Sequence, residues 1–180
     1  MTEQDRPDSK PDSKAASGKP KILDWTDAVE FARRTRAERE TLVLANGCFD
    51  LLHGGHISYL EGARAEGGRL IVGINSDASE RAIKGPSRPI VPQSDRAELL
   101  AGMEAVDAIV IFDEPDCERL LRELRPDVHA KGTDYTIETV PERAIAQELG
   151  IRIAIVGAPK ENDTKSIIDA MREAADRSEK

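Results

Sequence analysis

Two histidines separated by two glycines form the densest group of chemically useful side chains in this sequence. They are His53 and His56, at the end of the segment NGCFDLLHGGH that spans residues 46–56. A helix is expected to begin here, and a helix N-terminus offers free N–H groups and the positive end of a dipole to an anion. Glycine lets the backbone approach a ligand closely. The segment is therefore suited to binding a polyphosphate, although it matches neither the P-loop pattern nor the dinucleotide fingerprint.

Two other interpretations of these histidines compete with phosphate binding. They could be surface side chains at the start of an ordinary helix. Together with Cys48 they could also supply three zinc ligands, but a structural zinc site takes four, and the remaining cysteine and histidine, Cys117 and His129, are isolated in the sequence. We therefore predict no metal-ligating residues. We expect Cys48 to behave as a small apolar residue, as free cysteines usually do.

A rigid loop with several cations lies later in the chain. KGPSRP begins at Lys84 and includes Arg88, and Arg96 follows it closely. Arginine offers a planar fork that matches phosphate, and lysine offers a point charge. Taken alone, such a loop is either a solvated surface or an anion site. Its expected place after a buried strand favours the anion site.

Two further polar segments carry weaker signals. KGTDY contains Lys131, which could meet a phosphate, and Asp134, which could accept from a hydroxyl or an amine or help to hold a metal. The same run of residues often marks only a turn. NDTKS opens the last helix, where Asp163 or Thr164 suits an N-cap. Alternatively, the Thr164 hydroxyl and the Lys165 ammonium group contact terminal phosphates.

Short apolar runs alternate with helical patterns and must position these side chains. We expect five strands, at residues 41–45, 69–74, 108–112, 127–130 and 151–156. We expect helices at about 25–38 (capped by Asp24), 55–66, 94–103, 117–124, 141–149 and from 164, with a polar loop over 75–92. This alternation predicts an α/β fold, a doubly wound five-stranded parallel sheet of the Rossmann-like kind. A ligand then belongs at the carboxyl ends of the strands, after Ala45, Ile74, Ala130 and Val156.

The charge balance excludes several classes of function. The 180 residues include 26 Lys plus Arg and 34 Asp plus Glu, a net charge of −8, which argues against broad binding to nucleic acid. One Trp, two Tyr and three Phe are too few for a base-stacking surface. The sequence has no apolar run of about 18 residues, as a membrane-spanning helix needs, and its N-terminus lacks the apolar region of a signal peptide. We therefore expect no membrane contact and a cytoplasmic location.

The chain divides into a tail and one domain. Residues 1–20 are polar and their charges cancel, so they are expected to be disordered. Residues 21–180 then form a single domain that carries the whole −8. Within this acidic domain, five cations are expected at one edge of the sheet, where they would make a cationic pocket: Lys84, Arg88, Arg96, Lys131 and Lys165.

The phrase GCFDLLHGGHISYL, residues 47–60 with an H-x-G-H core, resembles the signature of the cytidylyltransferase-like nucleotidyltransferases. Four further phrases are similar to one branch of that family, the adenylyltransferases of ADP-heptose synthesis: NSDAS, KGPSRPIVPQSDR, LLAGMEAVDAIVIF and KGTDY. The resemblance runs from about Ile22 to Met171. One position departs from the branch, because Asp163 stands where a serine is usual. The branch is fused to a sugar kinase in some bacteria, and since this sequence has no kinase-sized segment, a stand-alone form is expected.

The resemblance implies that ATP and D-glycero-β-D-manno-heptose 1-phosphate give ADP-heptose and pyrophosphate, for a lipopolysaccharide core or another heptose-containing glycan. It implies that His53 and His56 contact the phosphates where charge develops, and that Lys84 and Arg88 orient the reacting groups. Mg²⁺ would be carried mainly by phosphates and water, with help from Asp50 or Asp134. A homodimer is expected. The nucleotide contacts that the resemblance implies are at Asn46, Gly47, Cys48, Phe49, Gly55, Lys131, Gly132, Asp134, Thr164 and Lys165.

Two alternatives remain open at the level of sequence. A cytidylyltransferase that acts on a polyol or amino-alcohol phosphate, such as glycerol 3-phosphate, shares the fold, the motif and the chemistry. A nucleotide-binding regulatory module would share the fold without catalysis. Release of pyrophosphate from ATP only when a sugar phosphate is present separates an enzyme from a regulator.

Overall fold

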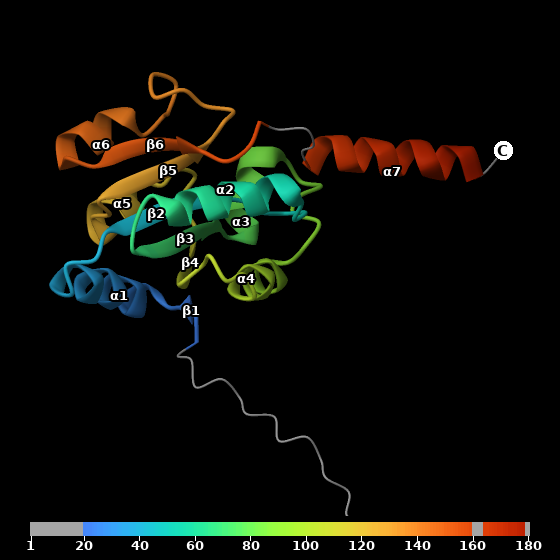
Figure 1. The fold of residues 1–180 in the computed structure, drawn as a ribbon. Coiled ribbons are helices and arrows are strands. Elements are labelled where there is room, and N and C mark those ends of the chain that lie inside the picture. The colour runs from blue at the N-terminus through green and yellow to red at the C-terminus, as the bar shows by residue number, and fades with distance from the viewer. Residues whose placement is uncertain (1–19, 160–163, 179–180) are drawn as a thin grey trace, which may run out of the picture.

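A parallel β-sheet forms the centre of the molecule (Figure 1). The computed structural model describes residues 20–159 and 164–178. Six strands lie in the order β1-β4-β3-β2-β5-β6, and every pair is parallel. The doubly wound parallel sheet predicted from the sequence is confirmed, with one strand more than expected. The strands are β1 (Ile22–Leu23), β2 (Leu42–Gly47), β3 (Arg69–Asn75), β4 (Ala108–Phe112), β5 (Val128–Gly132) and β6 (Arg152–Val156).

Helices cover both faces of the sheet, which explains why the strands read as continuous apolar runs. In β2, Val43 and Ala45 belong to one hydrophobic core, together with residues of α2 and α4. The alternating residues Leu42 and Leu44 belong to the opposite core, with residues of α1, α5 and α6. The helices are α1 (Trp25–Ala37), α2 (Gly54–Ala65), α3 (Asp77–Lys84), α4 (Gln93–Ala101), α5 (Glu118–Leu124), α6 (Arg143–Leu149) and α7 (Thr164–Ser178).

Helix α3 corrects the sequence prediction of a polar loop over residues 75–92. The helix is short and lies within a polar segment, and the residues that it buries are Ser79 and Glu80 rather than apolar side chains. Its ends are nevertheless well defined. The Ser76 side chain accepts a hydrogen bond from the Ser79 N–H at 3.2 Å, and acidic residues lie in the first turn and basic residues in the last. Capping and charge therefore stabilise a helix that hydrophobicity alone does not reveal.

Helix α2 is held by close packing toward its C-terminal end and by a cap at its start. A Cβ atom placed on Gly62 would lie 2.9 Å from the backbone N of Gly157, so α2 contacts the end of β6 through two glycines. The N-cap of α2 is His53, whose Nδ1 accepts a hydrogen bond from the Gly55 N–H at 3.2 Å. The predicted N-cap of α1, Asp24, is also confirmed, because it accepts from the Asp27 N–H at 2.8 Å.

The order of the strands reverses at β2. The chain proceeds from β2 to β3 and β4 on one side, and then crosses to β5 and β6 on the other. In such sheets the crevice outside the carboxyl ends of the strands at the reversal binds the ligand. Helix α7 extends away from the sheet (Figure 1). In the described part of the chain, no helix has the length and apolar character needed to cross a bilayer.

Candidate functional site

A cavity of about 430 Å³ opens at the carboxyl ends of β2 and β5, where the strand order reverses. It therefore lies where the sequence predicted a ligand. The structure brings together twelve of the predicted site residues in its lining: Asn46, Gly47, Cys48, Phe49, His53, Gly55, His56, Lys84, Lys131, Gly132, Asp134 and Thr164.

The two histidines lie next to each other at the N-terminus of α2. Their ring centroids are 3.9 Å apart, and the ring centroids of His56 and Phe49 are 5.2 Å apart. Phe49 is buried and has a φ of 54°, a left-handed conformation that turns the chain sharply between β2 and α2. The turn brings both imidazoles and the N-terminus of α2 to the same side of the cavity. An anion in the cavity would meet all three.

The β5 side of the cavity is built around Lys131. Its ammonium group lies 3.1 Å from Oε2 of Glu142 and donates to Oδ1 of Asn46 at 3.3 Å. Burial disfavours the ionised carboxyl group of Glu142, but the charge of Lys131 and the thiol of Cys117 outweigh it and hold the pKa of Glu142 below its usual value. Lys131 is itself almost completely buried. It is therefore fixed in place before any ligand arrives.

Arg88, predicted as a phosphate contact, does not line the cavity. Its guanidinium group forms an ion pair with Asp50, which also accepts hydrogen bonds from the N–H groups of Ile90 at 2.7 Å and Val91 at 2.9 Å. Burial opposes ionisation of Asp50, but the N–H of Val91 and the Arg88 guanidinium outweigh it, so its pKa lies below the usual value. Arg88 thus ties its loop to the β2–α2 turn. Its role toward substrate stays a prediction.

Arg96 corrects the expectation that five cations gather around the site. It is fully buried, with ion pairs to Asp77 at 2.8 Å and Glu80 at 3.3 Å, and it donates to the backbone carbonyl of Cys48. Burial and then the nearby Asp50 charge raise the pKa of Glu80, although Arg96 opposes them. Arg96 therefore braces the loop that carries the cavity residues and does not bind a ligand.

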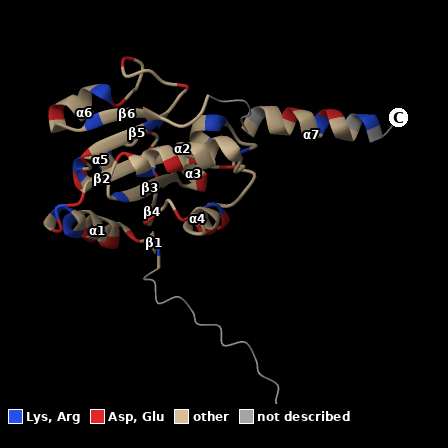
Figure 2. Ribbon diagram, viewed as in Figure 1, with Lys and Arg blue, Asp and Glu red and all other residues tan. Residues whose placement is uncertain are grey.

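The charges that line the cavity are mixed, contrary to the cationic pocket that the sequence suggested. Within the described lining, the bases are Lys84 and Lys131, and the acids are Asp50, Asp116, Asp134 and Glu142. Lys and Arg also lie among Asp and Glu on helices such as α1 and α7 (Figure 2). Arg88 pairs with Asp50, and Lys131 pairs with Glu142. The electrostatic potential in the cavity therefore depends on these individual ion pairs more than on the net charge of the protein.

The last predicted segment is described only in part. Asp163 lies outside the described residues. Thr164 begins α7, lines the cavity, and donates its hydroxyl to the Leu51 carbonyl at 3.5 Å. Lys165 follows it in α7, and its contact with phosphates stays a prediction.

A cluster that the sequence did not predict lies beside the cavity. Cys117 and His129, judged isolated from their spacing, approach to 3.7 Å between Sγ and Nε2, and Glu142 completes a group of three. Burial, and then the charge of Lys131, lower the pKa of His129 to about 4, so its imidazole is neutral at physiological pH. Across the described chain, the alternative set of Cys48, His53 and His56 does not form such a group. The sequence could not predict this cluster, because Cys117, His129 and Glu142 belong to three different elements and follow no recognisable spacing.

Known proteins that are similar to this chain match it over the residues that line the cavity. A model of the cytidylyltransferase-like family matches residues 44–177. The bifunctional protein HldE of Geotalea uraniireducens is 45% identical over 162 residues, 90% of this chain and 32% of that protein. HldE of Methylobacillus flagellatus is 43% identical over 82% of this chain and 30% of its own length. The chain thus spans about a third of the length of the curated relatives that it matches.

Solved structures extend the comparison to the fold. A lipopolysaccharide core biosynthesis protein from Thermoplasma volcanium has a TM-score of 0.57 and 25% identity, covering 67% of this chain and 99% of that one. Pantoate-β-alanine ligase from Francisella tularensis, with a TM-score of 0.57 and 16% identity over 79% of this chain and 68% of its own, shares the fold. The family model covers most of the chain, including the paired histidines and the cavity. The chain belongs to the cytidylyltransferase-like family.

Proposed function

We propose that this protein is an adenylyltransferase that joins ATP to D-glycero-β-D-manno-heptose 1-phosphate and releases pyrophosphate. The observation that carries the proposal is the meeting of His53, His56, Lys84 and Lys131 in one cavity at the reversal of strand order. The likeness to HldE proteins and to a lipopolysaccharide core biosynthesis protein favours a heptose phosphate as the acceptor. The product would then enter a heptose-containing glycan.

The reaction needs little proton transfer from the protein. A sugar phosphate is largely anionic near neutral pH, since its second pKa is about 6. One of its oxygens attacks the α-phosphorus of ATP, and the bond from that phosphorus to the bridging oxygen of the β-phosphate breaks. The electron pair leaves with pyrophosphate. Catalysis is then positioning together with stabilisation of charge on the phosphoryl oxygens.

Each cavity side chain contributes to positioning or to charge stabilisation according to where it lies. His53 and His56, with the N-terminus of α2, stabilise the phosphoryl oxygens where negative charge grows. Lys131, held by Glu142 and Asn46, binds a phosphate oxygen from the β5 side. Lys84 is exposed at the rim and orients the incoming phosphate. Gly47, Cys48 and Phe49 supply backbone contacts beside the nucleotide, and Thr164 contacts the departing pyrophosphate. The pyrophosphate contact that the family resemblance implies for Lys165 stays a prediction.

The lining residues fit a magnesium ion held largely by the substrate. Mg²⁺ usually keeps several waters and takes one or two protein carboxylates besides substrate phosphates. Asp134 and Asp116 line the cavity, and within the described residues no group of three carboxylates forms a ready-made cage. When bound with ATP, Mg²⁺ would neutralise part of the triphosphate charge. Of the two carboxylates that the family resemblance implies, Asp50 is already paired with Arg88, so Asp134 is the one that would assist.

A matrix of substrates tests the assignment. Pyrophosphate release is measured with ATP, CTP, GTP or UTP, each combined with heptose 1-phosphate, hexose 1-phosphates or glycerol 3-phosphate. We expect the highest kcat/KM for ATP with the heptose 1-phosphate. The protein with both His53→Ala and His56→Ala, purified in the same way, reports any contaminating activity.

Two outcomes would overturn the proposal at different levels. A preference for CTP with glycerol 3-phosphate would replace it with a cytidylyltransferase while preserving the chemistry of the site. Tight nucleotide binding without pyrophosphate release for any pair would make the protein a regulatory module. The homodimer implied by the family resemblance is tested separately, by the molar mass in solution from light scattering.

A further inference from the structure

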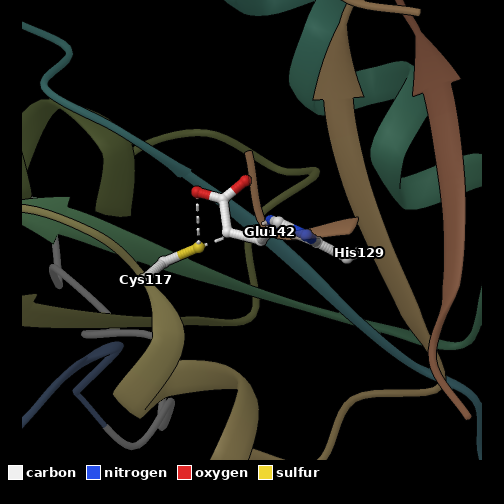
Figure 3. A group of neighbouring side chains, drawn as sticks. All are labelled: Cys117, His129 and Glu142. Atoms are coloured by element: carbon white, nitrogen blue, oxygen red, sulfur yellow. Dashed lines mark hydrogen bonds between the residues drawn. The ribbon is translucent and has the colours of Figure 1, made fainter. Parts of the chain in front are cut away.

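Three buried side chains with metal-binding atoms lie next to one another (Figure 3), and one of them, Glu142, also lines the cavity. Cys117 precedes α5, His129 lies in β5, and Glu142 precedes α6. The exposed fractions are 0% for Cys117, 0% for His129 and 9% for Glu142. A thiol, an imidazole and a carboxyl group are rarely buried together unless they serve one another or a shared ligand.

The spacing of their atoms suits a common central ion. Sγ of Cys117 lies 3.2 Å from Oε1 of Glu142 and 3.7 Å from Nε2 of His129. All three ligand atoms lie within 4.8 Å of one another. Ligands that stand about 2.0–2.3 Å from a tetrahedral zinc ion are separated from each other by about 3.5 Å. Small adjustments of the side chains would therefore suffice to close the site.

The types of donor select the class of metal. Mg²⁺ and Ca²⁺ take oxygen ligands almost exclusively. A thiolate and an imidazole together favour zinc or a similar transition-metal ion, and such ions also accept a carboxylate as a third ligand. The chemistry of Cys117 and His129 thus separates this cluster from the Mg²⁺ that would accompany ATP.

The surroundings supply a fourth ligand position and balance the charge. Oδ1 of Asn46 lies 3.1 Å from Nε2 of His129, on the cavity side of the cluster. Lys131 is paired with Oε2 of Glu142 at 3.1 Å, which leaves Oε1 directed at the thiol. If the thiol gave up its proton to solvent, the two negative ligands and Lys131 would leave the site with a modest net charge around a divalent ion.

We propose that Cys117, His129 and Glu142 bind a divalent ion of the zinc class, with Asn46 or a cavity water in the fourth position. The ion enters through the cavity, whose lining includes Glu142 and Asn46. A sulfur–metal bond replaces the S–H bond of Cys117, and no group is oxidised or reduced. The bound ion fixes Asn46 and, through Glu142, Lys131, so it stiffens the β5 wall. The inference does not depend on which substrates the cavity takes.

Cobalt(II) is the probe that tests this site. The full-length protein is treated with a chelator, freed of it, and titrated with Co²⁺ in the absence of nucleotide. We expect one equivalent to bind, with the near-ultraviolet charge-transfer absorption of a cobalt–thiolate bond and the visible bands of a tetrahedral ion. Zn²⁺ should abolish both signals by displacement. Failure of the wild-type protein to develop the thiolate absorption would overturn the proposal, leaving a hydrogen-bonded cluster without a metal.

Matched variants identify the ligands. Cys117→Ser should lose the charge-transfer absorption, whereas Cys48→Ser should retain it, because Cys48 belongs to the cavity and not to the cluster. Glu142→Gln, which preserves size, should weaken Co²⁺ binding by at least about tenfold. Circular dichroism checks that each variant is folded. Loss of the absorption in Cys48→Ser together with its retention in Cys117→Ser would instead assign cobalt to the cavity histidines and overturn the proposal.

Discussion

Two segments border the cavity, and their charged side chains serve different ends. The histidine segment, residues 46–56, presents His53 and His56 to the cavity at the start of α2. The arginine segment, residues 84–96, presents Lys84 but turns Arg88 and Arg96 toward buried carboxyl groups. Both segments looked like anion sites in the sequence. The difference shows that a cation is available to a ligand only where the fold has not already given it a partner.

Hydrogen bonds link the two segments, so the second supports the first. Asp50 of the histidine segment accepts from Arg88 and from two backbone N–H groups of the arginine segment. Arg96 donates to the Cys48 carbonyl. Variants in the two segments should therefore separate stability from turnover.

Replacing Arg96 should produce the largest effect. Arg96→Met leaves Glu80 buried without its cation, and loss of one partner of a buried pair costs about 3–5 kcal/mol. Urea unfolding measures this loss. Arg33→Met is the control, because Arg33 pairs with Glu30 on the exposed face of α1 and should change stability little. Similar losses in both variants would contradict a bracing role for Arg96.

Replacing either histidine should abolish most of the turnover. His53→Ala and His56→Ala each remove a group that stabilises developing charge, so kcat should fall by about 10²–10³-fold. Because His53 also caps α2, His53→Asn is the informative control: its side-chain oxygen can restore the cap but cannot replace the imidazole. Near-normal turnover of His53→Asn would limit His53 to a capping role.

Replacing Lys84 should change kcat/KM, whereas replacing Arg88 should change the stability of the fold. Lys84→Met should lower kcat/KM with little change in stability, since Lys84 is exposed and lines the cavity. Arg88→Met should destabilise the fold by about 1–3 kcal/mol, because Asp50 loses a buried partner. Adding Asp50→Asn to Arg88→Met removes both charges. If stability recovers and kcat/KM does not, Arg88 also contacts the substrate.

The pH dependence of stability should carry a smaller contribution from Asp50. Its pKa is lowered in the folded state, so its contribution is fully present above its unfolded pKa of about 4 and is lost as the pH falls through the lower folded value. Asp50→Asn should therefore be less stable than the wild type at pH 7, by a margin that narrows in acid. Besides burial, the Asp50 charge raises the pKa of Glu80, which contributes with the opposite sign, so the comparison is repeated in a Glu80→Gln background, where the Glu80 contribution is absent. A margin that stays constant in acid would contradict the ion pair.

Most of the sheet was predictable because burial on both faces leaves continuous apolar runs, as in β2 and β3. The two-residue strand β1 was missed because so short a segment has no pattern of its own. Helix α3 was missed because Ser76 and Arg96, and not an apolar stripe, hold it in place. In both cases a tertiary contact adds to a weak local signal, since β1 pairs with β4 and Arg96 of α4 reaches Glu80 of α3, which Ser76 already caps locally.

The sequence by itself determined the class of fold, the edge of the sheet at which the cavity opens, and the paired histidines at the start of α2. These follow from local hydrophobicity and from motif spacing along one stretch of chain. Only the tertiary structure decided which charged groups face the cavity and which are neutralised, since Arg96 reaches Glu80 and Arg88 reaches Asp50 across separate segments. It alone assembled Cys117, His129 and Glu142, because the crossover past β3 and β2 brings together residues that no linear spacing relates.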